Sequence, residues 1–290
     1  MASPTVIWLV IFCYFPILGL VMAFQDLNIT AGILGSPFVG LKNFRFLFAT
    51  TDAWVITRNT VCYNAVFIVI NMVFSVLMAL LLSELRSRVA AKSLQTVYML
   101  PYFLSWAVVA IIVSAFLDRD YGLANRMMIS LGQQAKPVDY YTKRSIWPYL
   151  LVGINAWKGV GYQTVLYLAV ISGISTEYYE AAVLDGATKR QQAWYITIPH
   201  LRMVISISII LAMGSIFRGD FGLFYVVTKN TGRLYPVTDV IDTYIYRALT
   251  RLSNVGMATA SGMYQSVVGF IMVLIVNSIV NRIDPDSAMF

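Results

Sequence analysis

The chain has 290 residues, of which 59% are hydrophobic and only 12% are charged. A soluble domain carries charge on about a quarter of its residues, so this composition excludes an ordinary soluble protein and indicates a polytopic membrane protein. The net charge is +7, but Lys and Arg are scattered through the loops. Because no basic tract is present, the charge does not indicate nucleic-acid binding.

Six stretches are long and apolar enough for the roughly 20 residues that a membrane-spanning helix needs. These predicted spans are Pro4–Phe24, Asn59–Leu82, Val97–Leu117, Pro148–Ile174, Met203–Val227 and Thr259–Val280. The first is interpreted as a true span because it lacks the basic start of a signal peptide, the first charge being Asp26. The absence of any charge before this span leaves open whether natural N-terminal residues precede it. We expect an all-α protein with six transmembrane helices, forming one domain over residues 1–290.

The sequence contains no pattern typical of an enzyme. No stretch matches the phosphate-binding pattern G-x-x-x-x-G-K-[ST], and no serine lies in a nucleophile-elbow pattern. His200 is the only histidine, and no metal ligands lie near it in the sequence. The two cysteines, Cys13 and Cys62, fall in apolar runs and have no metal-ligand spacing. We therefore predict no catalytic residues, no metal and no cofactor bound by this chain.

A polar segment, EYYEAAVLDGATKRQQAWYITIP, interrupts the apolar pattern before the fifth predicted span. Thr176 is a candidate helix cap, with negative charge following it in the first turn. Gly186 suits the left-handed residue that ends a helix, so we expect two short helices that meet at a turn. Small side chains at Ala181 and Ala182 would let a partner approach closely. Without a partner, such a segment is also compatible with a helix lying on lipid headgroups.

The spacing E-A-A-x-x-x-G, then nine residues, then I-x-x-P resembles the EAA loop of binding-protein-dependent ABC importer permeases. It is formed by Glu180, Ala181, Ala182, Gly186, Ile196 and Pro199, with Ile198 where the family usually has leucine. Segments along the rest of the chain, among them SPFVGLKNF, LPYFLSW, DFGLFYVVT and LYPVTDVIDTYIYRAL, are similar to the permeases of complex or modified saccharides. That branch includes permeases suited to uronate-containing oligomers such as alginate fragments.

The resemblance implies a specific role for the polar segment. The loop at about residues 175–201 would be cytoplasmic and would dock on an ATPase subunit. The residues expected to make this contact are Tyr178, Tyr179, Glu180, Ala181, Ala182, Leu184 and Gly186. Both termini would then be cytoplasmic, a point that the distribution of Lys and Arg between loops does not decide.

Polar side chains in the apolar stretches are candidates for a substrate path, because they are costly in a membrane. In the fourth predicted span Asn155, Lys158 and Tyr162 share one helical face, with Trp157 and Gln163 close by. An amide, an aromatic ring and a cation suit a sugar, although the same side chains suit packing between helices. In the fifth span Arg218 and Asp220 are expected to form a buried pair or to take part in the path.

The resemblance also implies the other components of the transporter. They are a second permease subunit, two ATPase subunits that use ATP and Mg²⁺, a solute-binding protein, and a saccharide carried across the bacterial inner membrane. Since Lys158 has no acidic neighbour within a helical turn, an acidic saccharide is a hypothesis on a par with a neutral one. The alternative is an ion-coupled transporter that works alone, which would call for an unpaired acid or an inverted repeat.

Overall fold

The computed structural model describes residues 3–28, 30–45, 51–133 and 136–283. These residues are almost entirely helical and contain no strand, apart from one isolated bridge between Gln25 and Phe38. The long helices are α4 (Thr51–Ser83), α5 (Arg88–Phe103), α6 (Trp106–Leu117), α8 (Trp147–Ser172), α11 (Ile198–Gly214) and α14 (Val255–Ile283). The first helix is continuous over Ser3–Phe24 and comprises α1 (Ser3–Leu9), η1 (Val10–Tyr14) and η2 (Phe15–Phe24).

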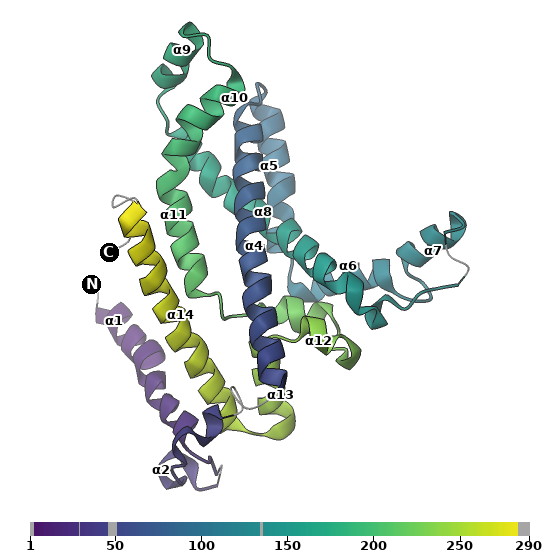
Figure 1. The fold of residues 1–290 in the computed structure, drawn as a ribbon, viewed down its shortest axis with the longest axis vertical. Coiled ribbons are helices and arrows are strands. Elements are labelled where there is room, and N and C mark those ends of the chain that lie inside the picture. Colours follow the sequence, from purple (N-terminus) through teal and green to yellow (C-terminus); the bar gives the residue numbers. More distant parts are fainter. Residues whose placement is uncertain (1–2, 29, 46–50, 134–135, 284–290) are drawn as a thin grey trace.

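Shorter helices lie at the two ends of this bundle (Figure 1). One end carries α9 (Thr176–Leu184), α10 (Lys189–Gln192) and η6 (Ala193–Thr197). Toward the opposite end lie α2 (Gly32–Gly35), α12 (Tyr235–Thr238) and α13 (Ile241–Leu252), while α7 (Leu123–Ser130) projects to the side beyond α6. The other short elements are η3 (Gly40–Phe44), η4 (Tyr140–Thr142), η5 (Arg144–Ile146), η7 (Gly222–Val227) and η8 (Gly232–Leu234). We call the two ends of the bundle the α9 end and the α13 end.

The described helices agree with a polytopic membrane protein. Four of them are long and apolar enough to cross a membrane: Ser3–Phe24, Asp52–Ser83, Lys189–Gly214 and Val255–Arg282. The pair α5 and α6 passes the same test as one broken span. Helix α8 has 26 residues, but the polar residues in its middle lower its mean hydropathy, so the count of six spans stays a prediction.

The third predicted span, Val97–Leu117, is not one continuous helix in the structure. The structure divides it into α5 and α6, which meet at an angle of 97°. Pro101 lies in the last turn of α5, and Leu104 and Ser105 are extended. The Ser105 hydroxyl then accepts the N–H of Val108 and starts α6 as a new helix. The apolar residues continue across the break, so hydropathy alone does not reveal it.

The fifth predicted span, Met203–Val227, is also interrupted. The helix begins at Lys189, ends at Gly214, and is followed by irregular backbone before η7. Neighbouring side chains bind the carbonyl groups that this break frees. The Asn64 amide donates to Ile216 O and Arg218 O at 2.8 and 2.9 Å, and the Gln265 amide donates to Phe217 O at 2.7 Å. Such partners are required wherever a helix is broken inside a membrane.

Helices α5 and α8 approach each other unusually closely at Gly161. A Cβ atom at this position would lie 1.8 Å from the carbonyl oxygen of Tyr98, so only glycine fits. The contact lies beside the bend between α5 and α6, and it therefore helps to fix where α6 departs from the bundle.

We expect Gly161→Ala to destabilise the protein because the added methyl group must push two backbones apart. Overpacking of this kind costs roughly 1–3 kcal/mol of unfolding free energy. Thermal unfolding of the purified protein in detergent measures the effect. Gly153→Ala on the same helix is the matched control, because a Cβ atom there meets nothing within 4 Å. Equal unfolding temperatures for the two variants would contradict the assigned role of Gly161.

Candidate functional site

The α9 end is a helical hairpin of two short elements, as the sequence predicts. Its cap differs from the expected one, since the hydroxyl of Ser175, not of Thr176, accepts the N–H of Glu177 at 3.3 Å. Gly186 has φ of +77°, and the N–H of Ala187 donates to Ala182 O at 2.8 Å, which closes the helix end. The prediction of a left-handed glycine is confirmed. Thr188 and Gln191 then cap α10 reciprocally.

Three contacts hold this hairpin against the long helices. The hydroxyl of Tyr179 hydrogen-bonds that of Thr197 at 3.0 Å, and Lys189 pairs with Glu84 at 3.2 Å. The rings of Tyr178 and His200 lie 5.5 Å apart. A displacement of α9 is therefore transmitted directly to the start of the α11 helix and to the end of α4.

The outward side of α9 is apolar and free within the described chain. Leu184 is 89% exposed, Val183 59% and Tyr178 57%. Glu180, Ala181 and Gly186 are exposed as well, whereas Ala182 and Tyr179 are partly buried. Of the residues predicted for docking, Glu180, Ala181, Leu184 and Gly186 are thus accessible within the described chain. Tyr179 anchors the hairpin from beneath, and Tyr178 is exposed but also contacts His200.

A small polar cavity of about 210 Å³ lies between α4, α8 and α11. Asn155, Gln163 and Arg218 from the predicted path line it. They are joined by polar residues that sequence reasoning did not single out: Asn64, Asn71, Ser208 and Ser215. Asn64 and Asn71 are seven residues apart in an otherwise apolar span, and this spacing on one helical face was the available signal.

Hydrogen bonds order the wall of this cavity. The Asn71 amide donates to Asn155 Oδ1 at 2.9 Å, and the hydroxyl of Ser75 donates to Val160 O at 3.0 Å. The side-chain oxygen Oδ1 of Asn71 is buried and has no hydrogen-bond partner among the described residues. Arg218 is exposed, and its guanidinium forms no hydrogen bond or ion pair with another described residue. The cavity therefore presents one acceptor without a partner and the Arg218 guanidinium, which lies within electrostatic reach of Asp242.

The other predicted path residues lie elsewhere. The Lys158 ammonium donates to the carbonyl oxygens of Leu104, Tyr102 and Pro101 at 2.5, 2.7 and 3.3 Å. It also lies 5.2 Å from the centre of the Trp106 ring. Lys158 therefore compensates the carbonyl groups at the bend between α5 and α6, where the negative end of the α5 dipole also lies.

Aromatic residues complete this arrangement around the bend. The Tyr162 ring stacks on Tyr102, with centroids 4.5 Å apart, and Trp157 is 47% exposed away from the polar cavity. The expected ion pair between Arg218 and Asp220 is wrong. Asp220 instead accepts the N–H of Leu223 at 3.2 Å, at the start of η7, and lies within electrostatic reach of Lys158. The break in the fifth span separates the two charges, since it turns Arg218 toward the cavity.

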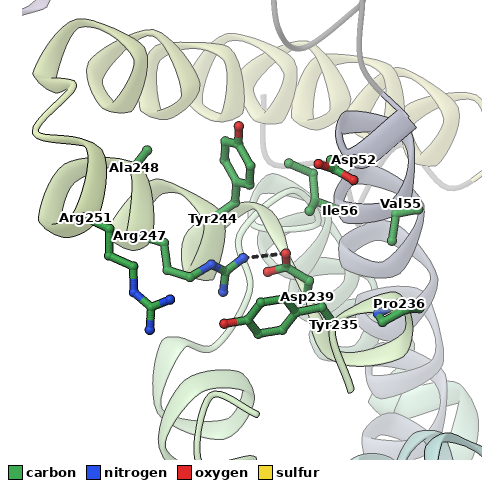
Figure 2. Close-up of a pocket in the computed structure, with 10 residues that line it drawn as sticks. All are labelled: Asp52, Val55, Ile56, Tyr235, Pro236, Asp239, Tyr244, Arg247, Ala248 and Arg251. Atoms are coloured by element: carbon green, nitrogen blue, oxygen red, sulfur yellow. Dashed lines mark hydrogen bonds and ion pairs between the residues drawn. The ribbon is translucent and has the colours of Figure 1, made fainter. Parts of the chain in front are cut away.

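A second hollow, of about 380 Å³, lies at the α13 end between α4 and α13 (Figure 2). Arg247 forms an ion pair with Asp239 and lies 4.3 Å from the centre of the Tyr235 ring. Arg251 lines the same hollow, but its side chain has no hydrogen bond or ion pair to another described residue. The hollow thus presents a fixed aromatic wall and one free cation.

We expect Lys158→Met to destabilise the protein because three carbonyl groups at the bend lose a charged donor. Hydrogen bonds to charged groups contribute roughly 1.5–3 kcal/mol each, so a clear fall in thermal unfolding temperature is predicted. Lys158→Arg should keep most of the wild-type unfolding temperature, because arginine also donates to the carbonyl groups. Lys143→Met, at an exposed lysine outside the bundle, is the control. Wild-type stability of Lys158→Met would show that the bend does not depend on this cation.

Comparisons with known proteins agree with this geometry. Residues 55–285 match the family described as binding-protein-dependent transport system inner membrane component. The chain is 33% identical over 282 residues to the polygalacturonan/rhamnogalacturonan transport system permease protein YteP of Bacillus subtilis, covering 97% of this chain and 87% of that protein.

Solved structures are similar over the same length. A bacterial ABC transporter involved in the import of the acidic polysaccharide alginate matches with a TM-score of 0.87 and 31% identity, covering 97% of this chain and 93% of the other. The alginate transporter in complex with an alginate pentasaccharide-bound periplasmic protein matches with a TM-score of 0.86 and 31% identity, over 97% and 92%. The chain belongs to the binding-protein-dependent transport system inner membrane components.

Proposed function

We propose that the chain is the permease subunit of an ATP-driven ABC importer that carries an oligo- or polysaccharide across the bacterial inner membrane. The observation that carries this proposal is the α9 hairpin, which is exposed, closed by a left-handed Gly186, and tied to two long helices. The family match over residues 55–285 includes this hairpin and supports its interpretation as the ATPase-docking loop. ATP hydrolysis, with its Mg²⁺, belongs to separate ATPase subunits.

The exposed apolar side of α9 is the proposed docking surface for an ATPase subunit. Leu184, Val183 and Tyr178 supply apolar contact, and the small Ala181 admits a close approach. Two ATPase subunits and a second, different permease subunit would complete the importer. The α9 end would then face the cytoplasm. A cytoplasmic position of both termini is part of the same proposal, and it is supported by the start of α1 and the end of α14, which point toward that end (Figure 1).

The α13 end is proposed to receive a solute-binding protein on the other side of the membrane. One support is that a solved similar transporter has a periplasmic protein in complex with it. The other is the hollow of Figure 2, where Arg251 is free to pair with an acidic side chain beside the Tyr235 wall. Such charges across an interface steer association more than they add affinity.

We propose an acidic saccharide as the substrate and Arg218 as the residue that recognises its carboxylate. Arg218 is exposed at this cavity, with Asp242 as its acidic neighbour, and lies beside amide and hydroxyl groups that suit sugar hydroxyls. Lys158 is less suited to this task, because three carbonyl oxygens already bind its ammonium. The names of the similar proteins, which include a galacturonan permease and an alginate importer, point the same way.

The docking proposal predicts that Gly186→Val uncouples the importer. Valine is strained at positive φ, and strain of this kind costs about 1–3 kcal/mol, enough to lower uptake and ATPase stimulation about tenfold or more. Gly186→Asn is the matched control, because asparagine tolerates this conformation and should keep most activity. Both variants are assayed for membrane insertion, retention of the ATPase subunit and uptake. Normal uptake by Gly186→Val would remove the assignment.

The substrate proposal predicts a selective defect in Arg218→Gln. Uptake of a uronate oligomer should fall by about tenfold, consistent with the loss of one charged hydrogen bond, while a neutral oligomer of equal length is little affected. Arg218→Lys should retain part of the uronate uptake. Lys158→Gln serves as comparison and should lower uptake of both oligomers equally, through the bend. If Arg218→Gln affects both substrates alike, the charge-reading role is wrong.

A further inference from the structure

A polar hollow of about 730 Å³ lies at the α9 end. Its walls come from the end of α4, the start of α5, the end of α8 and the α9 hairpin. In Figure 1 the hairpin lies close to the ends of α4 and α5. The proposed docking surface on α9 faces outward from the hairpin, so this cavity is a separate feature behind it.

The rim of the cavity is strongly basic. Arg86, Arg88, Lys92 and Lys189 line it, and Glu84 is the single acid, already paired with Lys189. The side chains of the other three cations form no hydrogen bond or ion pair with another described residue. The cavity therefore carries three positive charges that the described chain does not balance.

The position of these charges makes their lack of a partner more significant. Arg88 and Lys92 lie in the first two turns of α5, whose start is capped by the Ser87 hydroxyl. The N-terminal end of a helix is itself electropositive, so cations there are unfavourable and an anion is favoured. A bound anionic group would relieve both the mutual repulsion of the cations and their repulsion from the helix dipole.

The floor of the cavity is apolar and continuous with the membrane-crossing part of the bundle. It includes Leu82, which is 5% exposed, Ile171, which is 8% exposed, and Leu168. Since α4 is a candidate span that ends at Ser83, the basic rim follows directly on an apolar membrane-crossing stretch. A site with a basic rim and an apolar floor matches a phospholipid better than a free phosphate ion.

We propose that this cavity binds an anionic phospholipid of the cytoplasmic leaflet, with its phosphate on Arg86, Arg88 and Lys92 and the start of its acyl chains on the apolar floor. The placement in this leaflet rests on the proposed cytoplasmic position of the α9 hairpin. Tyr179, Thr197 and Lys189 line the same cavity and carry the contacts that hold the hairpin. The bound lipid thus touches the element that connects ATP hydrolysis to the spans.

The test uses the complete transporter in nanodiscs of phosphatidylcholine, with and without phosphatidylglycerol. Native mass spectrometry counts retained phosphatidylglycerol, and binding-protein-stimulated ATPase activity is measured on the same discs. The variant is the triple replacement Arg86→Gln, Arg88→Gln and Lys92→Gln. A control with the same charge change at three exposed cations nearer the α13 end is Arg119→Gln, Arg126→Gln and Lys143→Gln.

We expect phosphatidylglycerol to bind the wild type and the control equally and the triple variant at least about tenfold more weakly. The stimulation of ATPase activity by phosphatidylglycerol should be lost in the same triple variant. Equal binding of phosphatidylglycerol to all three proteins would overturn the proposal. So would inorganic phosphate in pure phosphatidylcholine discs, if it raised the wild-type ATPase activity as much as phosphatidylglycerol does. Loss of the ATPase subunit from the triple variant in both kinds of disc would show a protein contact instead. If the binding protein fails to stimulate the wild type, the proposed function fails independently of lipid binding.

Discussion

The requirement that every backbone polar group in a membrane has a partner governs the arrangement of this protein. Two of the predicted spans are broken, and each break frees carbonyl groups inside the apolar region. Lys158 binds those at the bend between α5 and α6, while Asn64 and Gln265 bind those after Gly214. The polar residues of α4, α8 and α14 are therefore explained first by the breaks that they stabilise.

The same breaks create the features that transport requires. The end of α11 at Gly214 turns Arg218 toward the polar cavity, and the bend after α5 directs α6 away from the bundle (Figure 1). Both irregular segments contact α4 or α8, which pack on one another along the bundle and run from near the α13 end toward the α9 hairpin. In the proposed importer, a movement of the hairpin would reach the polar cavity through these packed helices.

Local signals in the sequence predicted the α9 hairpin well. The left-handed turn at Gly186 and the small residues before it depend on neighbouring residues alone, so pattern and spacing were sufficient. The cap was misplaced by one residue, from Ser175 to Thr176, because either hydroxyl suits that position. The broken spans were missed, since hydropathy averages over the turns at Leu104 and after Gly214, and the partners of those turns lie far away in the chain.

Lys158 illustrates the other limit of sequence reasoning. Its lack of an acidic neighbour suggested a charge to be balanced by the cargo, but its actual partners are carbonyl oxygens about 55 residues away. The polar cavity, by contrast, includes three of the predicted path residues together with Asn64 and Asn71. Which polar residues face a cavity and which face a break depends on tertiary packing, which the spacing along one helix does not specify.

The central claim is that an ATPase acting through the α9 hairpin drives sugar import, and one reconstitution tests it most directly. The complete transporter is placed in proteoliposomes with an ionophore that abolishes ion gradients, and a radiolabelled uronate oligomer is supplied with its binding protein. We predict that the oligomer accumulates only when ATP is present on the side of the membrane that carries the ATPase subunits. We also predict that the loaded binding protein raises the ATPase rate. Accumulation that requires an ion gradient and proceeds without ATP would contradict the account and favour an ion-coupled transporter.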